Sequence, residues 1–318
     1  MSRVFVHDGK TTREQGLVAY CALPVAPFFT WVHIDGRAED AREIARQMAD
    51  MPDAAINALV AQETRPRCTF MGPGALINLR GPGQAAEGDG DPLVSIRLWA
   101  EKARVISVSY RKLDAIEPIT ERMLAGTIHD PGDLIAYLAQ EITDVLDPEV
   151  AELGDTLDDI ESAISEDGHA ESRRRVSRIR ATAISYRRFI APQRQAIERL
   201  ATADAPWLED EDRLHLQEAA DRCARMAEEL EAVRERSALA HEGLTDLRAE
   251  RMNLQALIIS IVALVFLPLT FLTGLLGMNV EGIPFAHAPW AFWGVVGICL
   301  LLAAAISGWF IAGHWLKR

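Results

Sequence analysis

Two long apolar segments lie in the last fifth of the chain. Residues 254–280 contain no Lys, Arg, Asp or Glu, and none occurs between Glu281 and Lys317. Each segment has about 20 residues or more, which is enough for a helix to cross the hydrocarbon core of a bilayer. We therefore predict two transmembrane helices, at residues 254–279 and 290–314. A loop at residues 280–289 joins them, and residues 315–318 form a short tail.

The chain before residue 112 has the pattern of short strands separated by Gly, Pro and Asp. The segments with this pattern are Arg3–Val6, Leu17–Cys21, Phe29–Ile34, Ala75–Leu79, Leu93–Trp99 and Arg104–Tyr110. The last two alternate polar and apolar residues around Glu101-Lys102, which predicts an antiparallel hairpin. Residues 39–61 have helical periodicity, and residues 81–92 are expected to form a loop. This predicts an α+β domain with a mixed sheet flanked by helices.

Charge divides the next part of the chain into two blocks. Residues 123–171 contain 14 acidic side chains and no Lys or Arg, whereas residues 173–199 carry nine Arg. A turn signal at Asp167-Gly168-His169 lies between the blocks, so we predict an acidic and basic helical hairpin within residues 117–200. Two interpretations remain open: a solvated hairpin with complementary faces, or an acidic helix, Asp144 to Asp167, that lines a cation path or holds a regulatory metal.

A heptad seam follows. Between Pro206 and Pro268 the chain has no proline, and apolar residues recur at spacings of four and three. The seam residues are Ala219, Cys223, Met226, Leu230, Val233, Ser237, Ala240, Leu244, Leu247, Arg251, Leu254 and Ile258. This predicts a stalk helix on the order of 100 Å long, with its cytoplasmic part at residues 206–253 after a domain at residues 1–205. Such a seam needs neighbours, either in its own chain or in other copies.

A second stripe runs through the first apolar segment, and its members are small or polar. They are Asn253, Ala256, Ser260, Ala263, Leu267, Thr270 and Gly274. Within a membrane, such a face indicates either tight helix packing or a path lined by water. The two alternatives stay open at this point.

The first apolar segment closes with Gly277-Met278-Asn279. A Gly-x-Asn at the exit of a penultimate transmembrane helix resembles the CorA superfamily of divalent metal-ion transporters. Residues 280–284 look more like its zinc-transporting ZntB-like branch, since they lack the Met-Pro-Glu-Leu loop usual in the magnesium branch. The resemblance implies an αβα funnel domain and a homopentamer with one axial pore. In that assembly Leu267 would form an apolar constriction, Thr270 would offer hydroxyls, and Asn279 would close a Gly-Met-Asn selectivity filter.

Candidate metal ligands lie at the outer mouth and on the stalk. Glu281 and His287 are in the loop between the spans, where carboxylates would raise the local cation concentration. His215 with Glu211 and Glu218, and His241 with Glu242, are two further candidate groups on the stalk. Each group either binds zinc inside the funnel or is a solvated part of the surface. The four cysteines are scattered, which argues against a disulfide framework and a structural zinc site. We therefore expect no permanently bound cofactor, with the divalent cation as cargo.

Charge around the spans predicts the topology. Arg248 and Arg251 precede the first span, Lys317 and Arg318 follow the second, and the loop between them has no Lys or Arg. By the positive-inside rule both termini are cytoplasmic. The membrane would be the bacterial inner membrane. The net charge of −13 makes nucleic acid an unsuitable partner, and no nucleotide loop or catalytic motif supports an enzyme.

The favoured function is transport of zinc, with cadmium or nickel as alternates. A magnesium or cobalt channel is the alternative within the class. A membrane-anchored coiled-coil scaffold or sensor without transport is the alternative from another class.

Overall fold

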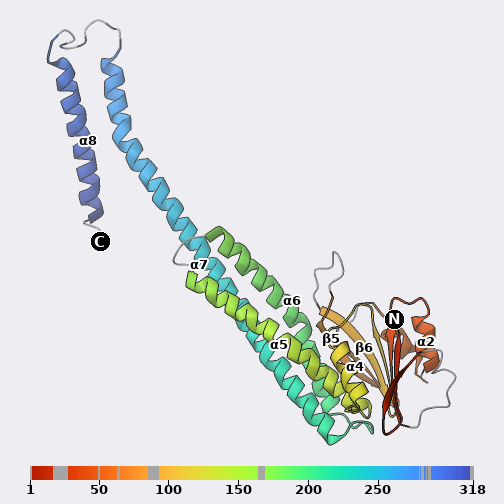
Figure 1. The fold of residues 1–318 in the computed structure, drawn as a ribbon. Helices are drawn as coiled ribbons and strands as arrows, with labels where there is room; N and C mark the ends of the chain where they lie inside the picture. Colours follow the sequence, from red (N-terminus) through yellow and green to blue (C-terminus); the bar gives the residue numbers. More distant parts are fainter. Residues whose placement is uncertain are drawn as a thin grey trace. The chain divides into compact units, whose positions relative to one another are not determined.

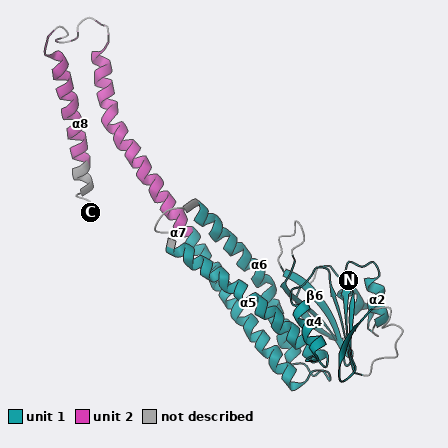
Figure 2. Ribbon diagram, in the orientation of Figure 1, with its two compact units in different colours: residues 1–241 teal, residues 242–318 magenta. Residues whose placement is uncertain are grey.

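The structure is a computed structural model. It describes residues 2–16, 28–48, 51–62, 65–84, 93–163, 169–278, 280, 283, 285 and 288–315. The chain forms two compact units, Met1–His241 and Glu242–Arg318 (Figure 2). The division at His241 falls inside a helix, between the boundaries at residues 205 and 253 that the sequence suggested.

Within the described residues of the first unit, seven strands form one mixed sheet in the order β2-β1-β3-β7-β6-β5-β4. The strands are β1 (Arg3–His7), β2 (Thr12–Gln15), β3 (Phe29–Asp35), β4 (Arg67–Met71), β5 (Gly74–Pro82), β6 (Leu93–Glu101) and β7 (Arg104–Ser109). β3 and β7 run parallel, and the other neighbouring pairs are antiparallel. The predicted mixed sheet is therefore confirmed.

Five predicted strands correspond to β1, β3, β5, β6 and β7, and the predicted hairpin is the pairing of β6 with β7. The predicted strand Leu17–Cys21 lies outside the described residues. β2 and β4 were not predicted. β2 has the sequence Thr-Arg-Glu-Gln, so it carries no apolar alternation, and only its backbone pairing with β1 marks it as a strand.

Two short helices cover one face of the sheet, α2 (Ala41–Met48) and α3 (Asp53–Leu59). They pack a core of buried side chains that includes Val32, Leu76, Trp99, Ile106, Ile44 and Leu59. Both helices lie within residues 39–61, the segment with helical periodicity. Pro52 is the N-cap residue of α3. Proline lacks the backbone N–H that a continuous helix needs, so the helical pattern is divided at this position.

Helices α5 (Pro131–Ala163) and α6 (His169–Ala201) lie on the other side of the sheet, so this unit has three layers (Figure 1). Gln193 of α6 accepts a hydrogen bond of 2.6 Å from the backbone N–H of Arg80 in β5, and the Arg80 guanidinium lies over the ring of Phe189. A short helix, α4 (Ile116–Ala125), precedes α5 and ends at Gly126, whose φ of 75° is in the left-handed region.

Helix α7 (Asp210–Leu276) packs its first half against α5 and α6 (Figure 1). The acidic helix pairs with arginines of α7: Asp144 with Arg222, and Glu161 with Arg236 at 2.6 Å. The basic helix also reaches α7, where Arg187 and Glu231 are 2.9 Å apart. The predicted packing of α5 against α6 is present, and Tyr186 of α6 donates a hydrogen bond of 2.7 Å to Glu149 of α5. The ion pairs named above, however, join each of these helices to α7.

This bundle changes the interpretation of the heptad seam. The seam residues Ala219, Cys223, Met226, Leu230, Val233 and Ser237 are at most 2% exposed within the single chain. The seam is therefore satisfied by helices of its own chain from residue 219 to residue 237, and this stretch gives no reason to expect further copies. Farther along, Arg251, Leu254 and Ile258 are exposed.

The second unit contains the end of α7 and helix α8 (Ala291–Trp315). Both helices are long and apolar enough to cross a membrane, and none of their most apolar window is buried inside the chain. A core helix of a soluble protein would be mostly buried. Exposure of this much apolar surface instead fits two helices whose surroundings are lipid or further copies.

Candidate functional site

The small and polar stripe lies on the exposed face of the apolar part of α7. All seven of its members, Asn253, Ala256, Ser260, Ala263, Leu267, Thr270 and Gly274, are exposed in the single chain. Leu267 has 71% of its surface accessible, and a Cβ added to Gly274 would meet no atom within 4 Å. The spacing predicted in the sequence therefore corresponds to one continuous free face.

The opposite face of this segment is half-buried, and α8 lies beside it at Leu269 and Thr273. The half-buried residues of α7 are Leu257, Ile261, Val265, Pro268, Leu269, Leu272 and Leu276. At 100° per residue this face is roughly 160° around the helix from the stripe. A groove of about 390 Å³ between the two helices is lined by Leu269 and Thr273 of α7 and by Val296, Cys299 and other apolar residues of α8. Packing within the chain therefore does not use the stripe.

The hydroxyl of Ser260 gives the stripe a particular chemistry. Its Oγ donates a hydrogen bond of 2.8 Å to the carbonyl oxygen of Ala256, one turn earlier in the helix. With its proton committed to the backbone, the oxygen presents only lone pairs outward. Such an oxygen can accept a hydrogen bond from the water shell of a cation without bringing a formal charge into the membrane.

The proposed filter lies at the end of this face. Helix α7 ends at Leu276, and the N–H of Gly277 still donates a bond of 2.9 Å to the carbonyl oxygen of Thr273. Gly277 and Met278 are exposed. Asn279, Glu281 and His287 lie outside the described residues, so their predicted roles at the filter and outer mouth remain predictions.

Gly277 lies where a side chain would meet the last turn of α7. The described glycines with left-handed φ are Gly9, Gly72 and Gly126, so Gly277 does not need glycine for its φ angle. A Cβ at Gly277 would instead lie 3.0 Å from the carbonyl oxygen of Thr273, which is a tight contact. Limited space next to the last turn of the helix is the observed constraint.

The two groups of candidate ligands on the stalk have different surroundings. His215 Nδ1 lies 3.6 Å from Glu218 Oε2, and His215 Nε2 lies 4.0 Å from Glu211. However, the amide of Gln140 is 2.9 Å from the same Nδ1, so one ring nitrogen already has a partner from α5. His241 and Glu242 are adjacent exposed residues.

A cluster of three carboxylates was not predicted from the sequence. Asp130, Asp133 and Asp212 have oxygens within 4.8 Å of one another, and they form the one group of three such ligands found among the described residues. Their hydrogen bonds identify them as helix caps. Asp130 accepts from the N–H of Asp133, and Asp133 accepts from the N–H of His129 at the start of α5.

Asp212 caps α7 in the same way and contacts α5 closely. Its Oδ2 accepts a bond of 2.8 Å from the N–H of Glu209. A Cβ added to Gly132 would lie only 2.0 Å from this oxygen, so glycine is required there. Burial, followed by repulsion from Asp130 and Asp133, raises the pKa of Asp212 to about 6, and burial also raises the pKa of Asp133.

The chain has an α/β domain, a long helix that becomes apolar and a second apolar helix. Together they define a membrane protein whose first span has an exposed polar face. The chain belongs to the CorA family: the family model described as CorA-like Mg2+ transporter protein matches residues 28–318. Members of this family are membrane ion transporters, not enzymes.

Three known proteins illustrate the relationship. The zinc transport protein ZntB of Pectobacterium carotovorum is 34% identical over 91% of this chain and 86% of its own length. The divalent cation transporter CmaX of Pseudomonas aeruginosa is 33% identical over 88% of this chain and 85% of its own length. The solved structure of full-length CmaX protein has a TM-score of 0.78 and 29% identity, and it covers 96% of this chain and 97% of that one.

Proposed function

We propose that this chain transports a divalent cation, zinc, across the bacterial inner membrane along the stripe face of α7. One observation carries the proposal: the small and polar face of the span is exposed, while the opposite face is half-buried. A lone helix pair would leave Asn253, Ser260 and Thr270 facing lipid, which is unfavourable for polar side chains. Copies of the chain around an axis would place this face toward a shared path.

The number of copies is taken to be five, as in the assembly that the family resemblance implies. In that assembly Leu267 narrows the path, the Ser260 and Thr270 hydroxyls line it, and Asn279 forms a ring of amide carbonyls at the external end. Such a ring recognises a hydrated divalent ion by hydrogen bonding rather than by removing its water. Both termini are cytoplasmic in this proposal, so Glu281 and His287 are at the outer mouth.

Zinc is favoured over magnesium for two reasons. The ZntB relatives are named for zinc transport. The loop after the span also contains His287, and imidazole is a ligand that zinc accepts and magnesium does not favour. The family model is described by magnesium, so magnesium is the competing cargo. Uptake of each ion into the same proteoliposomes distinguishes them.

Cysteine accessibility tests whether the stripe lines the path. In a background with the native cysteines replaced by alanine, Ala263→Cys lies on the stripe and Val265→Cys lies on the half-buried opposite face. A small hydrophilic thiol reagent should react with Ala263→Cys in proteoliposomes and block zinc flux. It should leave flux through Val265→Cys largely unchanged. Equal sensitivity of the two variants, or no reaction at either, contradicts the assignment.

Oligomeric state provides an independent test. Native mass spectrometry of the purified protein in detergent should give a pentamer. A monomer or dimer as the sole species would remove the shared path and leave a membrane-anchored scaffold as the better description.

A further inference from the structure

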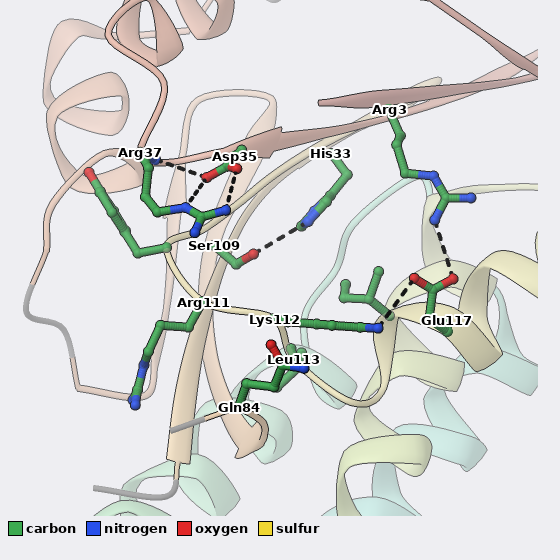
Figure 3. Close-up of a pocket in the computed structure, with 12 residues that line it drawn as sticks. Arg3, His33, Asp35, Arg37, Gln84, Ser109, Arg111, Lys112, Leu113 and Glu117 are labelled. Atoms are coloured by element: carbon green, nitrogen blue, oxygen red, sulfur yellow. Dashed lines mark hydrogen bonds and ion pairs between the residues drawn. The ribbon is translucent and has the colours of Figure 1, made fainter. Parts of the chain in front are cut away.

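A cavity of about 400 Å³ opens at one edge of the sheet in the first unit, far along the chain from the membrane spans (Figure 3). It lies where β3 and β7, the parallel neighbours, both end, at Asp35 and Ser109. β1 is antiparallel to β3, so its first residue, Arg3, lies at the same edge. The carboxyl ends of parallel strands, next to a change in strand direction, are a common position for ligand sites.

The cavity is basic although the chain is acidic. Four of its lining residues are cations, Arg3, Arg37, Arg111 and Lys112, and two are carboxylates, Asp35 and Glu117. The whole chain has a net charge of −13. Glu14, outside the lining, also pairs with Arg3 at 2.7 Å. Four cations against three carboxylates leave one positive charge in excess, opposite in sign to the chain as a whole, and an anion matches it.

Glu117 already shows how a carboxylate sits in this cavity. It is the first-turn acid of α4 and lies 3.4 Å from Arg3 Nη1 and 4.0 Å from Lys112 Nζ (Figure 3). Its side chain is 53% exposed, so these contacts are loose and are screened by water. Arg3 Nε and Nη2 are bonded to Glu14, so an incoming anion would share Lys112 and the remaining Nη1 of Arg3.

The other two cations are held in place by the fold. Arg37 makes hydrogen bonds of 3.0 Å and 2.8 Å to the two oxygens of Asp35, and the Arg37 guanidinium holds the pKa of Asp35 well below its usual range. Arg111 donates a bond of 2.6 Å to the carbonyl oxygen of Leu93. Fixed guanidinium groups suit phosphate, because less side-chain entropy is lost when the ligand binds.

Neutral hydrogen-bonding groups complete the wall. Burial lowers the pKa of His33 to about 4, so its ring is neutral at pH 7. Its two nitrogens lie 2.8 Å from Ser107 Oγ and 3.3 Å from Ser109 Oγ, which orients the Ser109 hydroxyl beside the cavity (Figure 3). The first turn of α4 also faces the cavity through Ile116 and Glu117, and no side chain caps its N-terminus.

We propose that this cavity binds a small phosphorylated anion, with Arg3 and Lys112 contacting the phosphate charge and Ser109 donating a hydrogen bond. The site is separate from the proposed ion path, since every residue that lines it belongs to the first unit. Its ligand is defined by chemistry: one or two phosphate groups on a body small enough for about 400 Å³.

Isothermal titration calorimetry on the full-length protein in detergent tests the proposal. The probes are ADP and pyrophosphate in metal-free buffer of low ionic strength, because divalent ions would carry phosphate to other sites. Adenosine serves as the uncharged comparison. Both phosphate probes should bind saturably, adenosine should not, and affinity should fall as salt is raised.

Three variants locate the binding. Lys112→Ala should weaken affinity about tenfold or more. Its matched control is Lys102→Ala, at the β6–β7 turn and therefore at the opposite end of β7. Glu117→Gln should strengthen binding about threefold or more, because it removes the carboxylate that competes for Arg3 and Lys112. A gain of affinity cannot result from misfolding.

Two outcomes overturn the proposal. One is the absence of saturable binding of either phosphate probe to the parent protein. The other is binding that Lys112→Ala and Lys102→Ala affect equally while Glu117→Gln leaves it unchanged.

Discussion

Asp212 offers a quantitative test of how the first unit is held together. Asp212 is 2% exposed. Burial and repulsion from neighbouring carboxylates raise its pKa from 3.8 to about 6. An acid whose pKa is raised by folding contributes most stability below its unfolded pKa. It loses that contribution as pH rises through its folded pKa. The difference between the folded and unfolded pKa values lowers the free energy of unfolding by about 3 kcal/mol at pH 7.5 and by about half as much at pH 5.

The variant Asp212→Asn removes the charge and keeps an oxygen that can accept from the N–H of Glu209. It should therefore raise the free energy of unfolding by up to about 3 kcal/mol at pH 7.5 and by about half as much at pH 5. Urea unfolding of the full-length protein in detergent, followed by far-UV circular dichroism, measures both values. The control is Asp210→Asn on the same first turn, where the carboxylate is fully exposed.

Either of two results would contradict the cost of the buried Asp212 charge. Asp212→Asn could be no more stable than the parent at pH 7.5, which would mean that the buried charge has no net cost. Alternatively, its advantage could be the same at pH 5 and pH 7.5, which would mean that the pKa of Asp212 is not raised.

Three further predictions concern packing and the ion path. Gly132→Ala should lower the free energy of unfolding by about 1–3 kcal/mol, because the new Cβ would lie 2.0 Å from Asp212 Oδ2; no loss in the same urea titration would show that the carboxylate moves aside freely. Leu267→Ala should increase zinc flux in proteoliposomes, since a wider apolar constriction admits water more readily; reduced flux with an intact assembly would contradict this role. Glu281→Gln should reduce zinc uptake severalfold at low salt and little at high salt, because salt screens an exposed charge; a loss independent of salt would point to direct coordination.

Much of the fold could be predicted from periodicity. Strand alternation located β6 and β7 and their hairpin, and the length of the apolar segments located both spans. The features that periodicity missed have physical causes. β2 (Thr12–Gln15) is a polar edge strand that is recognised only by its pairing, and Pro52 divides a helical pattern that continues on both sides of it.

The contacts between helices were harder to predict than the helices themselves. The heptad seam was located correctly, but a seam does not say which helix covers it, and α5 and α6 of the same chain do so up to Ser237. Charge blocks correctly suggested that α5 packs against α6, but they did not show that both helices also form ion pairs with α7, at Arg236 and Glu231. Long-range contacts decide these choices, and sequence spacing does not contain them.

The candidate sites show the same division. The stripe on α7 was predicted because its members share one helix, and the structure shows that the opposite face is half-buried. The carboxylate cluster joins Asp130 to Asp212, and the basic cavity joins Arg3 to Glu117. Neither could be predicted from the sequence, because folding alone brings such distant positions together.

The role of Asn279 as the filter of the ion path is tested by measuring zinc uptake into sealed proteoliposomes that contain the Asn279→Ala variant. The substitution keeps a small residue at the end of the α7 face and removes the amide carbonyl that is proposed to recognise the hydrated ion. Zinc uptake should collapse relative to the parent protein, while native mass spectrometry still gives the same assembly. Zinc uptake at the parent rate would contradict the filter assignment and, with it, the proposed path.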